Sequence, residues 1–228
     1  MAEQTLSTTI DESPAWFRQR WGVIVIGFLV AFGVGLIFAR VVESSPNWNR
    51  GMPWERALIL SIPRPLPSAI DALMMVVPWF GTNISLMPVI GVIILWLWRW
   101  RRRPDLAMRL LVVQLGSYFL NPALKFMVER ARPDLVERRG WYGWSAYPSG
   151  HAIAGIAVLL TIAIMLHSER GIRWPFAVAL FIAFTNMFSR LYLGVHWPID
   201  VLGGALVGLV WLIATMIAFR ARDVDQRR

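Results

Sequence analysis

Of the 228 residues 57% are hydrophobic and only 16% are charged, whereas a soluble domain has roughly a quarter charged residues, so the composition indicates an integral membrane protein. The net charge of +9 does not indicate nucleic-acid binding, because the basic residues stand in clusters between apolar runs and form no single basic face. The sequence contains no cysteine, which excludes disulfides, zinc–thiolate sites and thiol nucleophiles.

The first apolar run, Trp21–Ala39, is too long for the core of a signal peptide and predicts a retained membrane span. Prolines and tryptophans in residues 43–67 predict a segment at the membrane surface, with a short amphipathic helix from Trp54 to Ile62. The second span is expected mainly at Thr82–Trp98, with a bent lead-in where Pro78, Gly81 and Asn83 interrupt the apolar run. The other four spans are expected at Leu106–Val128, His151–His167, Trp174–Arg190 and Ile199–Phe219.

An even number of spans places both termini and the 99–105 and 167–173 loops on one side of the membrane. Arginines concentrate on that side, and positively charged loops stay in the cytoplasm, so both termini are expected to be cytoplasmic. The predicted division of the chain is a cytoplasmic tail at 1–20, a membrane domain at 21–219 and a second cytoplasmic tail at 220–228.

Three polar motifs stand at the ends of apolar runs, and the predicted topology places all three on the outer face. The motifs are Lys125-x6-Arg132-Pro133, Pro148-Ser149-Gly150-His151 and Ser189-Arg190-x5-His196-x3-Asp200. Hydrolysis of a phosphate ester spreads negative charge over three oxygens, which several fixed donors must meet. Taken singly, the motifs could be a positive flank, a helix cap and a structural hydrogen bond. Their occurrence together on one face favours a phosphoryl-transfer site that uses no metal.

The phosphate-binding candidates come from all three motifs. Lys125, Arg132 and Arg190 supply three cations, two of which have the forked guanidinium geometry that suits phosphate. Ser149 is the predicted N-cap of the fourth span, and Gly150 leaves room for an anion to approach free backbone N–H groups.

The catalytic candidates are His196, Asp200 and His151. Asp200 follows His196 by four residues, so its carboxylate can hold one imidazole nitrogen and leave the other nucleophilic. His151 then remains to donate a proton to the departing alkoxide. His167 has no such polar neighbours in the sequence, falls on the cytoplasmic side and is predicted to be non-catalytic.

Position for position, the three motifs resemble the signature of the type 2 phosphatidic acid phosphatase superfamily, over residues 70–219, with Tyr147 where phenylalanine is common. The resemblance implies an all-α bundle of six transmembrane helices with an outward-facing site and neither metal nor cofactor. It also implies that His196 attacks phosphorus to form a phosphohistidine, with Asp200 orienting it and His151 protonating the leaving group. The residues that the resemblance assigns to phosphate are Lys125, Arg132, Ser149, Gly150 and Arg190.

The function predicted on this basis is metal-independent hydrolysis of lipid phosphates or diphosphates, such as undecaprenyl diphosphate, phosphatidylglycerol phosphate or phosphatidic acid. The expected location is a bacterial inner membrane, with the site facing the periplasm or exterior. The expected partners are the lipid substrate and membrane lipids, and not nucleic acid. The oligomeric state is left open.

One alternative is a phosphotransferase that passes the same phosphoryl group to a lipid or sugar hydroxyl. A transporter or scaffold is less favoured, because inverted repeats and midplane charges are not apparent. Arg130, Arg138 and Arg139 either contact a second phosphate or are solvated loop charges.

Overall fold

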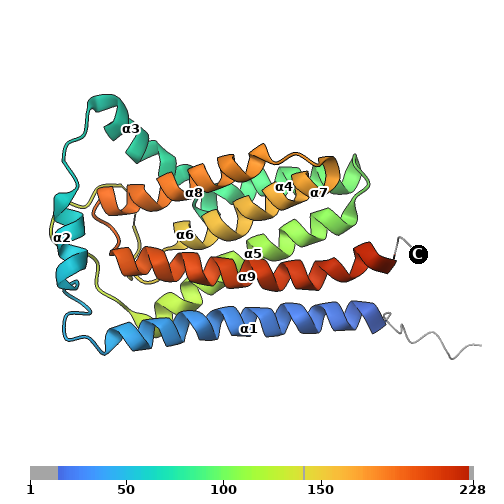
Figure 1. Cartoon of the computed structure of the whole chain (residues 1–228), viewed down its shortest axis with the longest axis horizontal. Coiled ribbons are helices and arrows are strands. Elements are labelled where there is room, and N and C mark those ends of the chain that lie inside the picture. Colours follow the sequence, from blue (N-terminus) through green and yellow to red (C-terminus); the bar gives the residue numbers. More distant parts are fainter. Residues whose placement is uncertain (1–14, 141, 226–228) are drawn as a thin grey trace, which may run out of the picture.

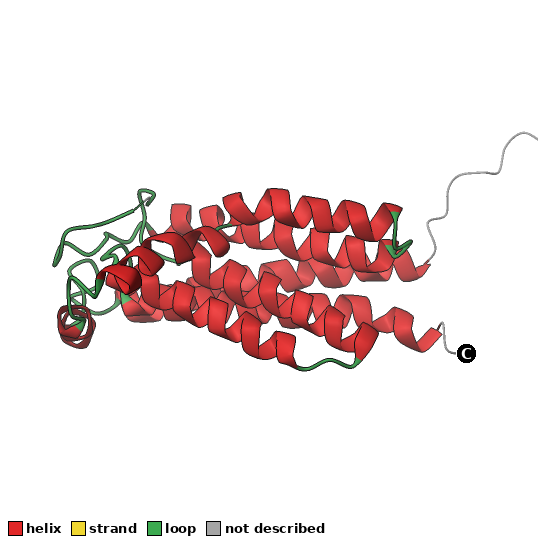
Figure 2. Ribbon diagram, turned by 90° about the horizontal axis from the view of Figure 1, so that it is seen from above, coloured by secondary structure: helices red, strands yellow, loops and turns green. Residues whose placement is uncertain are grey.

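The computed structural model describes residues 15–140 and 142–225, and all regular secondary structure in that part of the chain is helical. The chain forms a bundle whose long helices run side by side (Figures 1 and 2). Five helical stretches are long and apolar enough to cross a membrane, and a bent helix pair brings the number to six if it counts as one span. The all-α prediction is therefore confirmed, and the predicted six spans agree with this count when the bent pair is taken as one span. The spanning elements are α1 (Ala15–Glu43), the bent pair, α5 (Pro104–Val128), the continuous helix α6–η2–α7 (Gly150–Arg170), α8 (Trp174–Tyr192) and α9 (Pro198–Asp225).

The bent pair consists of α3 (Ser68–Val76) with η1 (Val77–Phe80), followed by α4 (Asn83–Arg99) after a bend of 58°. The break is stabilised from both sides. Asn186 of α8 donates from its side-chain amide to the Val77 carbonyl at 3.0 Å, and the Thr82 hydroxyl accepts from the Ser85 N–H at the start of α4. Because free backbone groups need such partners inside a membrane protein, the predicted bent lead-in is a packed feature of the fold.

The short surface helix is present as α2 (Pro53–Ser61), within one residue of the predicted bounds. It lies across one end of the bundle, at a large angle to the spanning helices (Figure 1). Trp54 is exposed, whereas Glu55 in the same turn is fully buried. This end of the bundle also holds the described parts of the irregular segments 129–149 and 193–197, which are yellow and orange in Figure 1.

Helix α1 begins and helix α9 ends at the opposite end of the bundle (Figure 1), so the predicted placement of both termini on one side agrees with the fold. Both helices are longer than the apolar runs that predicted them, since α1 begins at Ala15 and α9 ends at Asp225. Helical hydrogen bonding continues past the apolar runs because both extensions are rich in alanine and arginine, which are good helix formers. Residues 1–14 and 226–228 of the predicted tails lie outside the described residues.

The fourth span runs from Gly150 to Arg170 and contains a π-helical turn at Gly155–Leu159 that was not predicted. Hydropathy carries no signal for such a turn, because the apolar pattern of the run is the same with or without it.

The bundle core is built on close contacts at small residues. Trp211 of α9 is buried and donates its indole N–H to the Val113 carbonyl of α5 at 3.1 Å. A Cβ at Gly116 would lie 2.2 Å from the Trp211 ring, so only glycine leaves room for the indole there. A similar contact joins α1 to α9, where Gly27 packs against Ala214. Small residues at helix crossings are how membrane helices approach closely.

Gly27→Val is expected to lower the unfolding temperature of the detergent-purified protein, because a Cβ at Gly27 would lie 2.4 Å from the Ala214 Cβ. Overpacking of this kind typically costs about 1–3 kcal/mol of unfolding free energy. Gly33→Val on the same helix is the matched control, since a Cβ there meets no atom within 4 Å. Thermal unfolding followed by circular dichroism measures both variants, and equal midpoints would contradict the contact.

Candidate active site

The three motifs meet at a cavity of about 400 Å³, which is within the usual size range of small-molecule sites. The predicted residues that line it are Lys125, Arg132, Gly150, His151, Arg190 and His196. The other two, Ser149 and Asp200, are fully buried next to the lining, and the Ser149 N–H donates to the Asp200 carbonyl at 2.9 Å. All eight predicted site residues therefore gather in one place, although they come from three motifs that are far apart in the sequence.

Backbone carbonyls of the 129–149 segment hold two of the cations at the cavity. The Lys125 ammonium, in the last turn of α5, donates to the Ser145 carbonyl at 2.5 Å. Arg132 donates to the same carbonyl at 2.8 Å, to the Gly143 carbonyl at 2.6 Å and also to the Val195 carbonyl. One carbonyl oxygen thus brings an ammonium and a guanidinium together at the cavity wall. Arg190, in the last turn of α8, is 2% exposed and adds the third cation.

This concentration of positive charge controls protonation of the imidazole. Burial, with the cations Arg132 and Lys125 close by, holds the pKa of His196 well below its usual range. Burial also lowers the pKa of Arg132 to about 10, which leaves its guanidinium charged at neutral pH. The cavity therefore presents a neutral imidazole beside the Arg132 and Arg190 guanidiniums and the Lys125 amine, an arrangement suited to an anion.

His196 and Asp200 lie close together, but the predicted hydrogen bond between them is not formed. The distance from His196 Nδ1 to Asp200 Oδ2 is 3.6 Å, which is longer than a hydrogen bond allows. Asp200 Oδ2 instead accepts from the Trp197 N–H at 2.7 Å. The carboxylate therefore faces the imidazole as a charge. Because Nδ1 of the His196 ring faces the carboxylate, the other ring nitrogen, Nε2, is directed away from Asp200.

Ser149 occupies the predicted N-cap position of α6 (Gly150–Ala154), but its side chain makes no capping hydrogen bond. Among the described residues neither the buried Ser149 hydroxyl nor His151 Nε2 has a hydrogen-bond partner. Gly150 is required here by a protein contact, since a Cβ would lie 2.7 Å from the Asn121 side-chain nitrogen. Two polar groups in this region are consequently available for a ligand.

Sequence reasoning missed several residues of the cavity. Asn121 lines it one helical turn before Lys125, and that i, i+4 spacing was the signal that could have identified it. Tyr142 also lines the cavity, and the Arg132 guanidinium lies 5.4 Å from the centre of its ring. Ser145 was missed because its contribution is a backbone carbonyl, which every residue type possesses.

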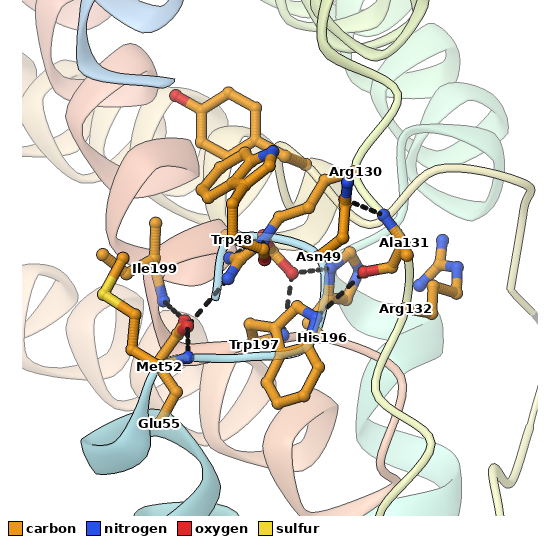
Figure 3. Close-up of polar contacts among 12 residues, drawn as sticks. Trp48, Asn49, Met52, Glu55, Arg130, Ala131, Arg132, His196, Trp197 and Ile199 are labelled. Atoms are coloured by element: carbon orange, nitrogen blue, oxygen red, sulfur yellow. Dashed lines mark hydrogen bonds and ion pairs between the residues drawn. The ribbon is translucent and has the colours of Figure 1, made fainter. Parts of the chain in front are cut away.

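Both readings of Arg130 were wrong, because this residue is fully buried and is neither a solvated loop charge nor part of the cavity lining. Its guanidinium donates to Asp200 Oδ1 and to Glu55 Oε2, each at 2.7 Å (Figure 3).

Arg139 forms two hydrogen bonds with Asp71, at 2.6 and 2.7 Å, and these bonds raise the pKa of the Arg139 guanidinium. Arg138 is exposed, and its guanidinium lies 5.6 Å from the centre of the Tyr142 ring.

His167 lies far from the cavity, as predicted. It belongs to the last turn of α7 (Leu160–Arg170), its Nδ1 is 3.3 Å from the Ile172 carbonyl, and its ring packs on Phe176. Nothing in its surroundings resembles the charge arrangement around His196.

Comparison with known proteins agrees with the motifs and the fold. The family model of the PAP2 superfamily matches residues 106–223. Phosphatidylglycerophosphatase B of Bacillus subtilis is 33% identical over 135 residues, which are 57% of this chain and 66% of that protein. The undecaprenyl-diphosphatase of Sulfolobus acidocaldarius is 24% identical over 165 residues, or 69% of this chain and 72% of that protein.

The structural likeness extends over most of the molecule. The crystal structure of a transmembrane PAP2-type phosphatidylglycerolphosphate phosphatase from Bacillus subtilis superposes with a TM-score of 0.72 and 25% sequence identity, covering 87% of this chain and 96% of that one. Family model, relatives and fold agree, so the chain belongs to the PAP2 superfamily and is an integral, multi-pass membrane phosphatase that acts on lipid phosphates.

Proposed function

We propose that this protein hydrolyses lipid phosphates or diphosphates through a phosphohistidine formed at His196. The observation that carries the proposal is the position of His196 beside Lys125, Arg132 and Arg190 in one cavity. A phosphate dianion offsets the mutual repulsion of these three cations. Its phosphorus then lies next to a nitrogen that has a free lone pair, because the imidazole is not protonated.

In the first chemical step, His196 Nε2 attacks phosphorus, since Nδ1 faces Asp200. A nitrogen–phosphorus bond forms and the bond from phosphorus to the lipid oxygen breaks. His151 donates its proton to that oxygen, so that the lipid departs as the alcohol or as the protonated monophosphate. The Asp200 carboxylate stabilises the positive charge that develops on the His196 ring.

In the second step, water attacks the phosphohistidine. His151, now neutral, accepts a proton from the water, and inorganic phosphate leaves with its new oxygen–phosphorus bond while His196 is regenerated. Lys125, Arg132 and Arg190 bind the equatorial oxygens in both steps, with the Gly150 N–H and the Ser149 hydroxyl as further donors.

A second cavity of about 420 Å³ supports a lipid as substrate. It shares Thr82, Ile84, His151 and Arg190 with the first cavity, and its other walls are mainly apolar, with residues Met75, Pro78, Trp79 and Leu193. An acyl or prenyl chain can thus run along η1 while its headgroup reaches the cations. Phosphatidic acid, phosphatidylglycerol phosphate and prenyl diphosphates such as undecaprenyl diphosphate all fit this description.

The cavity is proposed to face the periplasm or exterior of a bacterial inner membrane. The support is the charge distribution, since the arginine clusters at Arg99–Arg103 and at Arg170–Arg173 lie in loops at the other end of the spans. Positively charged loops of this kind remain cytoplasmic.

His196→Ala is expected to abolish phosphate release from lipid phosphates, because no other group in the cavity has the position of the attacking nitrogen. His167→Ala, which changes the histidine at the far end of the bundle, is the matched control and keeps wild-type turnover. The measurement is inorganic phosphate released from a panel of lipid monophosphates and diphosphates in detergent. Normal turnover by the His196 variant would exclude it as the nucleophile.

His151→Ala is expected to reduce turnover of lipid phosphates by roughly 10²- to 10⁴-fold, the usual contribution of a general acid. Turnover of an activated aryl phosphate falls much less, because its leaving group departs without a proton. Steady-state rates on the two substrate types measure the difference. Equal losses on both would show that His151 is not the acid.

Turnover is expected to survive EDTA and to be blocked by vanadate. Within residues 15–140 and 142–225 there is no cluster of three or more His, Cys, Asp or Glu side chains that could hold a metal ion, whereas the cation-lined cavity suits a phosphate analogue. Phosphate release with and without each reagent tests this expectation. Strong inhibition by EDTA, reversed by added Mg²⁺, would contradict it.

A further inference from the structure

Arg130 is the centre of a buried ionic cluster behind the cavity, made of Arg130, Asp200 and Glu55. None of the three side chains is exposed to solvent. The guanidinium also donates from Nε to the Trp48 carbonyl at 3.0 Å. Its Cζ lies 3.9 Å from the centre of the Trp48 ring and 5.5 Å from that of Trp197 (Figure 3). Every face of the guanidinium is thus in contact with protein.

A buried ionic cluster of this kind contributes little net stability to a fold. Removing ions from water carries a large desolvation penalty, and well-packed apolar side chains often replace a buried ion pair without loss of stability. Here the cluster also combines one cation with two carboxylates, so it keeps a net negative charge. A functional role explains why such a group is located beside the candidate nucleophile.

The hydrogen bonds of Asp200 indicate what that role is. Arg130 holds Oδ1, and the Trp197 N–H holds Oδ2, the oxygen that faces His196 Nδ1 at 3.6 Å. With both oxygens held, the carboxylate cannot rotate away from the imidazole. Its charge is partly offset by the guanidinium, so the proton on the imidazole is less readily transferred to it.

Glu55 fixes the other end of the guanidinium. Its Oε2 accepts from Arg130 at 2.7 Å and from the Met52 N–H at 3.0 Å, and its Oε1 accepts from the Ile199 N–H at 3.1 Å. The carboxylate of helix α2 is therefore tied to the first turn of α9, one residue before Asp200 in the chain.

We propose that Arg130 is a positioning residue for the Asp200–His196 pair and that Glu55 positions Arg130, so that phosphohistidine formation depends on a relay from the surface helix α2. The inference rests on the proposed function, because it needs His196 to be the nucleophile. It assigns a role in the reaction to two residues outside the three motifs.

The proposal predicts a change in pH dependence. The neutral imidazole attacks, so kcat/KM is lost as the pH falls and the Asp200–His196 pair takes up a proton. The charged or titratable groups that face the pair are Lys125 on α5, Arg132 in the following segment, Tyr147, His151 on α6, Arg190 on α8 and Arg130. If only Arg130 or its partner Glu55 is substituted, a change in the position of the acidic limb of the pH profile of kcat/KM is due to the relay.

Arg130→Met removes the cation and keeps a long side chain over Trp48. We expect kcat to fall roughly 10- to 100-fold, the usual loss when an outer-shell partner of a reacting group is removed. The acidic limb of kcat/KM moves to higher pH, because the pair takes up a proton more readily without the cation. KM and the vanadate inhibition constant change little, since Lys125, Arg132 and Arg190 are intact. Arg130→Lys retains the charge and is expected to bring the acidic limb back toward the wild-type position.

Glu55→Gln is the matched opposite change. It keeps an oxygen acceptor for the Ile199 N–H but removes a negative charge from the guanidinium. The cation then acts more strongly on Asp200, and the acidic limb is expected to move to lower pH. This variant decides the question if Arg130→Met does not fold, because an unshifted limb in folded Glu55→Gln overturns the proposal.

Both variants are measured with a lipid phosphate in detergent, after thermal unfolding has shown that each is folded. A loss of kcat in folded Arg130→Met with an unshifted acidic limb would mean that Arg130 only clamps the fold, and it overturns the proposal, as would wild-type kinetics. Failure of the proposed function gives a different result, namely no phosphate release by the wild type or full activity in His196→Ala. Opposite shifts in Arg130→Met and Glu55→Gln support the relay.

Discussion

A bilayer leaves no water for backbone N–H and C=O groups, so any segment that crosses it must be helical, and this constraint arranges the rest of the molecule. Among the described residues irregular chain is confined to the helix ends, and the longest stretch of it, within residues 129–149, lies at the end where the motifs meet. There its carbonyls serve a second purpose, because Ser145 and Gly143 accept from Lys125 and Arg132. The loop that cannot enter the membrane is thus the part that holds Lys125 and Arg132, two of the residues proposed to bind phosphate.

Charge in this region is arranged in two layers. The cavity wall is positive, with two arginines and a lysine around a neutral imidazole. Behind it lies a buried layer with net negative charge, in which Asp200 and Glu55 share the guanidinium of Arg130. In the proposed reaction, an anion in the cavity is attracted by the first layer, and the second layer supports positive charge on the imidazole when a bond to phosphorus forms. Under this proposal the two layers favour the same charge distribution, that of the transition state.

Predictions from the sequence succeeded where the signal was local. Apolar runs located the spans, Pro78, Gly81 and Asn83 located the bend before α4, and the predicted helix Trp54–Ile62 was within one residue of α2. The predictions failed where hydropathy gives no signal, as at the π-helical turn of Gly155–Leu159 and at the extension of α1 to Ala15, beyond the apolar run. The position of Ser149 as an N-cap was predicted, but the lack of a capping hydrogen bond from its hydroxyl was not.

The amino-acid sequence by itself determined the membrane class, the helix order and the identity of the groups that gather at one end, because hydropathy and motif spacing are properties of neighbouring residues. Tertiary structure alone decided how those groups are partnered. Arg130 meets Asp200 and Glu55 across 70 and 75 residues of chain, and Gly150 meets Asn121 from another helix. Whether a charged side chain is solvated or buried depends on which distant segments pack around it, so no local pattern could have shown that Arg130 lies beneath the cavity.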